Sequence, residues 1–229
     1  MALALPPFDY GQIAWVSLIP LFFALEGCER GEAFRRGYIA GLVFFGMTTW
    51  WTVHVTLPGM VGLVAFLALY FGVAAMWFAE LLAPSGNETK PRSDSIFRNL
   101  LASVLGAAGW VTLEWIRGNF LFGGFGWNGL GVTQHQMEPL IQFACFTGVY
   151  GVSGLLCLLN FTLFFTVRRL IDNATHSTER RRLSYEFYVA TILICAALIH
   201  GMRTIQGRRS TRVLSLVLVQ GNIPQTLKF

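Results

Sequence analysis

Charged residues are scarce in this chain of 229 residues, and that scarcity excludes most soluble folds. Asp, Glu, Lys and Arg together make up 13% of the sequence, whereas hydrophobic residues make up 54%. The mean hydropathy is +0.55. A water-soluble domain of this composition would expose large apolar patches, which a lipid bilayer tolerates and water does not. The composition therefore predicts an integral membrane protein.

The sequence also lacks the patterns of metal and redox sites. Its 4 cysteines form no C-x-x-C pair, and its 4 histidines are scattered without ligand spacing, so we expect no metal and no cofactor. Cys145, Cys157 and Cys195 fall within apolar segments, where cysteine ordinarily acts as a small apolar residue. No base adjoins Cys145 or Cys157 in the sequence, which argues against a nucleophilic role for either thiol.

Long hydrophobic runs are abundant. A helix needs about 20 apolar residues to cross about 30 Å of hydrocarbon. The runs predict about six spans, of which the first and last are short and the last is marginal. They cover residues 10–26, 38–56, 60–82, 99–116, 139–167 and 187–202. Between the second and third spans, Leu57-Pro58-Gly59 predicts a tight hairpin, and the turn residues of 84–87 and 172–175 predict two further connectors.

The basic residues lie in short blocks between the apolar runs, which is typical of topology determinants rather than of a nucleic-acid surface. We therefore expect no nucleic-acid partner. The loops after the first, third and fifth spans carry three, three and five Lys or Arg residues, against none in the second loop and one, Arg117, in the fourth. Because basic loops stay in the cytoplasm, both ends of the chain are expected on the outer side. Since Met1–Pro7 resembles no export signal, we expect either a missing preceding span or an N-terminus that starts outside.

The richest stretch runs from residue 110 to residue 136. Glu114 and Arg117 are one helical turn apart at the outer end of the fourth span, where they can form an ion pair. Beyond them, six glycines alternate with aromatic residues, which favours an interfacial or re-entrant loop over a spanning helix. Two interpretations stay open. The stretch is either a structural ion pair with an aromatic belt, or a platform on which Arg117 binds a phosphate and the aromatic rings contact acyl chains.

Several motifs in order resemble the membrane domain of the apolipoprotein N-acyltransferases, the last enzymes of bacterial lipoprotein maturation. They are Glu114-Trp115-Ile116-Arg117-Gly118, Gly124-Phe125-Gly126-Trp127, Pro139-Leu140-Ile141-Gln142 and the run from Thr147 to Ser153. The tail from Val217 to Phe229 is similar to the segment with which that family enters its nitrilase-like domain. The sequence departs from the family at Gly126, where proline is common, and has one extra residue between Glu114 and Trp127.

The resemblance implies an all-α polytopic membrane helix bundle over residues 1–205. Residues 211–229 would begin a periplasmic carbon-nitrogen hydrolase-like domain with the first β-strand of a missing α/β/β/α nitrilase-like fold. Its motifs imply that Arg117, Phe125 and Trp127 bind lipid. They also imply that Glu114, Gly124, Gln220, Gly221 and Asn222 are structural motif residues.

The family's reaction carries an acyl chain from a phospholipid, through a cysteine thioester, to the N-terminal diacylglyceryl-cysteine of an apolipoprotein. The glutamate, lysine and cysteine of that chemistry belong to the nitrilase-like domain, so no catalytic residue is expected in this chain, which would be inactive alone. The implied location is the bacterial inner membrane, with the C-terminal tail in the periplasm. Two alternatives stay open: an anchoring, lipid-binding subunit of a split enzyme, and a transporter, for which Glu80 is the obvious carboxylate outside the Arg117 loop.

Overall fold

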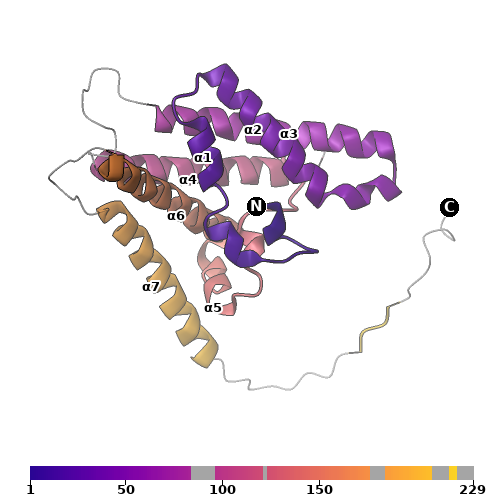
Figure 1. Ribbon diagram of the computed structural model, residues 1–229. Coiled ribbons are helices and arrows are strands. Elements are labelled where there is room, and N and C mark those ends of the chain that lie inside the picture. The colour runs from indigo at the N-terminus through magenta and orange to yellow at the C-terminus, as the bar shows by residue number, and fades with distance from the viewer. Residues whose placement is uncertain (84–95, 121–122, 176–183, 208–216, 221–229) are drawn as a thin grey trace.

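The computed structural model describes residues 1–83, 96–120, 123–175, 184–207 and 217–220, and every regular element within these ranges is a helix (Figure 1). The short 3₁₀ helices are η1 (Ala2–Ala4), η2 (Gly11–Trp15), η3 (Trp50–His54) and η5 (Gly131–Gln134). The α-helices are α1 (Ile19–Leu25), α2 (Arg30–Thr48), α3 (Leu57–Leu82), α4 (Ile96–Asn119), α5 (Glu138–Ile141), α6 (Ala144–Thr175) and α7 (Tyr185–Gly207).

Four helices of the described part are long and apolar enough to cross a membrane, so an all-helical membrane bundle is confirmed whereas the count of six spans is not. These four are α3, α4, α6 and α7. The helix that the sequence marks as marginal, α7, is a full span of 23 residues, because it continues past residue 202 to Gly207. Figure 1 shows α7 at the edge of the bundle.

The apolar run 10–26 is a broken segment rather than one helix. It divides into η2 and the short α1, and the buried side chain of Asn160 on α6 bridges the break. The amide N–H of Leu18 donates to Asn160 Oδ1 at 2.9 Å, while Asn160 Nδ2 donates to the carbonyl oxygen of Ala14 at 3.0 Å. Backbone groups released by a break inside a membrane must be satisfied by protein, and Asn160 does this here.

The predicted span 38–56 is also divided. Helix α2 begins at Arg30 and ends at Thr48, and η3 follows. The hydroxyl groups of Thr48 and Thr49 donate to the carbonyl oxygens of Phe44 and Phe45 at 2.9 and 2.6 Å, which satisfies carbonyls at the helix end.

Two predicted turns are wrong. Leu57-Pro58-Gly59 is the first turn of α3, a position that proline tolerates because the missing N–H has no partner there anyway. Residues 172–175 belong to α6, which extends to Thr175. The predicted connector 84–87 lies outside the described residues.

The core is aromatic where α1, α3 and α6 meet. The ring centroid of Phe22 lies 5.3 Å from that of Phe78 and 4.2 Å from that of Phe161, and all three residues are fully buried. Helices α2 and α3 pack closely because Gly41 faces α3, where a Cβ would come within 2.9 Å of the Cα of Ala68.

Ion pairs gather at one end of the bundle. Arg168 pairs with Glu26 at 2.6 Å and also with Asp172, and Arg30 pairs with Glu80. Nearby in the chain, Arg169 pairs with the fully buried Glu186 at 2.7 Å and joins α6 to α7. Arg30, Arg168 and Arg169 belong to basic blocks that the sequence marks as cytoplasmic.

The predicted C-terminal strand is not confirmed. Val217–Gln220 have no regular structure, and their side chains are exposed. The remainder of the segment 211–229, including Gly221 and Asn222, lies outside the described residues.

Candidate functional site

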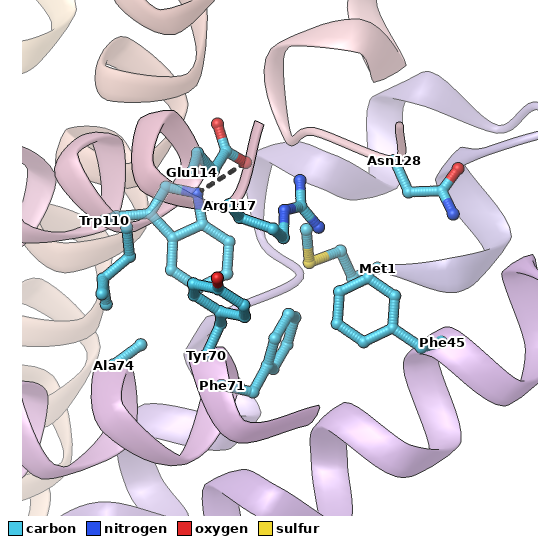
Figure 2. A pocket seen from close by; sticks show the side chains of 10 residues that line it. Met1, Phe45, Tyr70, Phe71, Ala74, Trp110, Glu114, Arg117 and Asn128 are labelled. Carbon is cyan, nitrogen blue, oxygen red and sulfur yellow. Dashed lines mark hydrogen bonds between the residues drawn. The ribbon is translucent and has the colours of Figure 1, made fainter. Parts of the chain in front are cut away.

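A pocket lies where α2, α3 and α4 approach the loop that follows α4 (Figure 2). It contains about 300 Å³ of space not filled by protein atoms, part of which is open to the outside. Its wall is mainly aromatic and aliphatic, with one carboxylate, one guanidinium and one amide. The lining residues are Met1, Phe45, Tyr70, Phe71, Ala74, Trp110, Leu113, Glu114, Arg117 and Asn128.

Arg117, in the last turn of α4, places its guanidinium in this pocket. Its residue is 5% exposed, and Figure 2 shows its guanidinium directed among Met1, Phe45 and Asn128. The guanidinium carbon lies 5.4 Å from the ring centroid of Phe45, a cation–π contact, and the buried Nε has no hydrogen-bond partner. Among the described residues, no carboxylate oxygen lies within ion-pair distance of this side chain.

Glu114 does not form the ion pair with Arg117 that the sequence predicts. Its Oε1 instead accepts two hydrogen bonds, from Trp110 Nε1 at 3.0 Å and from the backbone N–H of Leu130 at 2.7 Å. Helical spacing places Glu114 and Arg117 on neighbouring positions, but the loop brings the Leu130 amide to the carboxylate. Glu114 therefore joins α4 to the loop, and Arg117 keeps its charge directed into the pocket.

Two consecutive glycines turn the loop back onto α4. Gly123 and Gly124 have φ of +85° and +81°, and a Cβ on Gly124 would collide with the backbone of Gly118. The turn lets the Phe125 N–H donate to the carbonyl oxygen of Arg117 at 2.6 Å. Further along the loop, Asn128 Nδ2 donates to Thr48 Oγ1 at 3.0 Å, which closes the pocket against α2.

The predicted lipid-contact residues divide between two places. Arg117 lines the pocket, whereas Phe125 and Trp127 lie beside it with ring centroids 6.5 Å apart. Trp127 is 60% exposed, and its ring centroid lies 5.3 Å from that of Trp51 on η3. Gln220 lies in the exposed tail. Sequence reasoning missed Phe45, Tyr70 and Asn128, since nothing in their local pattern connects them to Arg117.

The structure also shows the surroundings of two other residues considered from the sequence, Glu80 and Cys145. Glu80, the carboxylate considered for a transporter, forms its ion pair with Arg30 and is half exposed, so it is not a carboxylate held in the bundle interior. Cys145 does have a base nearby, because His200 Nε2 on α7 lies 4.0 Å from its Sγ. Adjacency in the sequence could not show this contact, because 55 positions separate the two residues.

The sequence predicts that the protein has no metal site. In the part of the chain that the structure describes, no group of three or more His, Cys, Asp or Glu residues is arranged to hold a metal ion.

Comparison with known proteins gives a consistent result. Residues 1–162 match the family model of the apolipoprotein N-acyltransferase N-terminal domain. An apolipoprotein N-acyltransferase of Geobacter metallireducens is 32% identical over 243 residues, covering 100% of this chain and 42% of the relative. Its namesake in Rhizobium rhizogenes is 34% identical over 174 residues, covering 67% of this chain and 30% of the relative.

The chain thus spans at most about two fifths of the length of these relatives. A third, from Pseudomonas paraeruginosa, is 30% identical, with 99% of this chain and 42% of the relative covered. These bacterial relatives and the four membrane-capable helices support a multi-pass membrane protein and an acyltransferase by resemblance. The chain belongs to the apolipoprotein N-acyltransferase family.

Proposed function

We propose that this chain is the membrane part of an apolipoprotein N-acyltransferase. Its reaction transfers an acyl chain from a phospholipid, through a cysteine thioester, to the N-terminal diacylglyceryl-cysteine of a lipoprotein. The thioester chemistry belongs to a nitrilase-like domain, which would begin in residues 211–229, so the chain of 229 residues is inactive alone. The basic end of the bundle faces the cytoplasm of a bacterial inner membrane, and the pocket and the tail face the periplasm.

The observation that carries this proposal is the unpaired, buried guanidinium of Arg117. Burying a charge is costly unless an opposite charge or several hydrogen bonds compensate it. Arg117 has a cation–π contact with Phe45 and an Nε without a partner, so its donors are available to an anion in the pocket. A phosphodiester suits these donors, since a guanidinium can bind two phosphate oxygens at once.

The surroundings of Arg117 fit a lipid better than a soluble anion. Phe45, Phe71 and Trp110 give the pocket an apolar wall that acyl carbons can contact. Outside it, Trp51 and Trp127 are exposed, as expected for aromatic side chains at the boundary between hydrocarbon and headgroups. A phospholipid at this depth would place its phosphate beside Arg117 and its chains along the wall.

A fusion protein tests the proposal. This chain is joined to the part of the Geobacter metallireducens relative that it does not match, and the fusion is reconstituted in phospholipid vesicles. We expect it to transfer a labelled acyl chain from phospholipid to a diacylglyceryl lipopeptide, and we expect the chain alone to transfer none. Absence of transfer by a membrane-inserted fusion, beside an active native relative prepared in the same way, contradicts the proposal. Transfer by the chain alone contradicts the claim of inactivity.

A further inference from the structure

Tyr70 brings a phenol hydroxyl into the same pocket as Arg117. The residue lies on α3 and lines the pocket, and Figure 2 shows its hydroxyl oxygen among the side chains that form the wall. Tyr70 and Arg117 come from different helices, and they are close enough to interact electrostatically. The pocket therefore has a second polar donor, held by a second helix.

The structure gives this hydroxyl no protein partner. In the part of the chain that the structure describes, no hydrogen bond involves the Tyr70 oxygen. The Tyr70 ring packs against Phe66, with ring centroids 5.7 Å apart, and this contact holds the ring without satisfying the hydroxyl. Tyrosine hydroxyls that are enclosed by protein ordinarily have a hydrogen-bond partner. An unbonded hydroxyl in the wall of a pocket thus marks a position for a ligand atom.

The polar groups of the pocket include more free donors than free acceptors. Arg117 carries donors only, and its buried Nε has no partner. The carboxylate of Glu114 is an acceptor, but its Oε1 already accepts from Trp110 and from the Leu130 amide. A ligand that satisfies both Arg117 and the Tyr70 hydroxyl must therefore bring several acceptor oxygens on one group. A phosphodiester has such oxygens, and it also carries the charge that a buried guanidinium requires.

We propose that Tyr70 is a second phosphate-binding residue, whose O–H donates to the same phosphate that the Arg117 guanidinium binds. The assignment rests on the proposed function, from which it takes the phosphodiester beside Arg117. A phosphate held by one side chain can pivot about that contact. Donors from α3 and α4 together fix its orientation, and they thereby set the direction in which the acyl chains leave along the apolar wall.

Tyr150 offers a matched comparison. It also interacts electrostatically with Arg117, but it is not among the residues that line the pocket. Its hydroxyl oxygen accepts a hydrogen bond from Asn119 Nδ2 at 3.1 Å. If a hydroxyl must lie in the pocket to contact the phosphate, only the hydroxyl of Tyr70 contributes to binding.

The test measures binding of a soluble phospholipid to the purified chain in neutral detergent by isothermal titration calorimetry. The ligand is dihexanoyl phosphatidylglycerol, and dihexanoylglycerol, which lacks the phosphate-linked headgroup, is its control. Tyr70→Phe removes the hydroxyl and keeps the ring that packs against Phe66. We expect this variant to bind the phospholipid about tenfold more weakly or worse, the usual effect of losing a hydrogen bond to a charged group. Its affinity for dihexanoylglycerol should not change, and Tyr150→Phe should bind both ligands as the wild-type chain does.

Thermal unfolding without ligand separates a binding role from a structural one. Because the Tyr70 hydroxyl has no protein hydrogen bond to lose, we expect Tyr70→Phe to keep the wild-type midpoint. Unchanged phospholipid affinity in Tyr70→Phe overturns the proposal. Equal weakening by Tyr150→Phe also overturns it, since a place in the pocket would then not matter. Equal loss of affinity for both ligands has the same consequence, because the phosphate would not be what Tyr70 binds.

This experiment reads binding and not acyl transfer, so its failure differs from failure of the proposed function. An inactive fusion protein contradicts the N-acyltransferase proposal and leaves the binding result of Tyr70→Phe standing. An active fusion beside unchanged binding by Tyr70→Phe overturns the role of Tyr70 alone. A wild-type chain that binds neither ligand, or binds both equally well, overturns the role of Tyr70 whatever the fusion does.

Discussion

The carboxylate of Glu114 accepts the backbone N–H of Leu130 at 2.7 Å, and this bond attaches the loop after α4 to the helix that carries Arg117. The same oxygen accepts the indole N–H of Trp110. These two donors join Glu114 to the loop, and no oxygen of Glu114 lies within ion-pair distance of Arg117, whose side chain lines the pocket. The geometry of the pocket therefore depends on one buried acceptor.

Glu114→Ala is expected to destabilise the chain, because it leaves the Leu130 amide and the Trp110 indole unpaired. Each buried donor without a partner costs about 1–3 kcal/mol. Glu114→Gln keeps a carbonyl acceptor and should lose less. Thermal unfolding in detergent micelles measures both variants. If alanine and glutamine leave the midpoint at its wild-type value, the carboxylate does not hold the loop.

Gly124→Ala should disturb the loop, because φ of +81° costs a residue with a Cβ about 1–2 kcal/mol and the added carbon would also meet the backbone of Gly118. Gly126→Ala is the matched control, since a Cβ there would meet nothing within 4 Å. The free energy of unfolding reports the change. Equal effects at the two glycines would contradict the proposed turn.

Arg117→Gln in the active fusion is expected to lower acyl transfer ten- to hundredfold. A hydrogen bond to a charged group is worth about 1.5–3 kcal/mol, and each 1.4 kcal/mol corresponds to about a factor of ten. Arg117→Lys should fall between, since lysine keeps the charge but not the paired donors. Arg35→Ala, at an exposed position on α2, serves as the control. Unchanged transfer by Arg117→Gln, with normal membrane insertion, would remove Arg117 from the lipid site.

Arg169→Met should be strongly destabilising, by about 3–5 kcal/mol, because it leaves the buried carboxylate of Glu186 without its ion-pair partner. The double variant Arg169→Met, Glu186→Leu should recover most of that loss, since apolar residues can replace a buried pair. Arg30→Ala removes an exposed pair with Glu80 and should change stability little. Unfolding by denaturant in micelles compares the three proteins. Additive losses in the double variant would show that the pair is not coupled.

Hydropathy located the helices better than it located their breaks. The predicted spans 60–82 and 99–116 agree with α3 and α4 to within three residues at each end. The segments 10–26 and 38–56 are also predicted spans, but the first is broken at a place where Asn160 supplies the missing hydrogen bonds. That compensation comes from a residue more than a hundred positions away, which no local window contains.

The sequence predicted only part of the candidate site. The sequence pointed to Arg117 because a cation at the end of a span, followed by glycines and aromatic residues, is unusual within a single stretch. It predicted the wrong partner for Glu114, because helical spacing takes account of neighbours on the same helix and not of the Leu130 amide.

The sequence by itself determined the membrane class, most helix positions and the family, because hydropathy and motifs are properties of consecutive residues. The tertiary structure alone decided which side chains meet. It brought Phe45, Tyr70 and Asn128 around Arg117, and His200 beside Cys145. The physical reason is that contacts between distant residues follow from how helices pack and where the chain bends, and neither is encoded in any one segment.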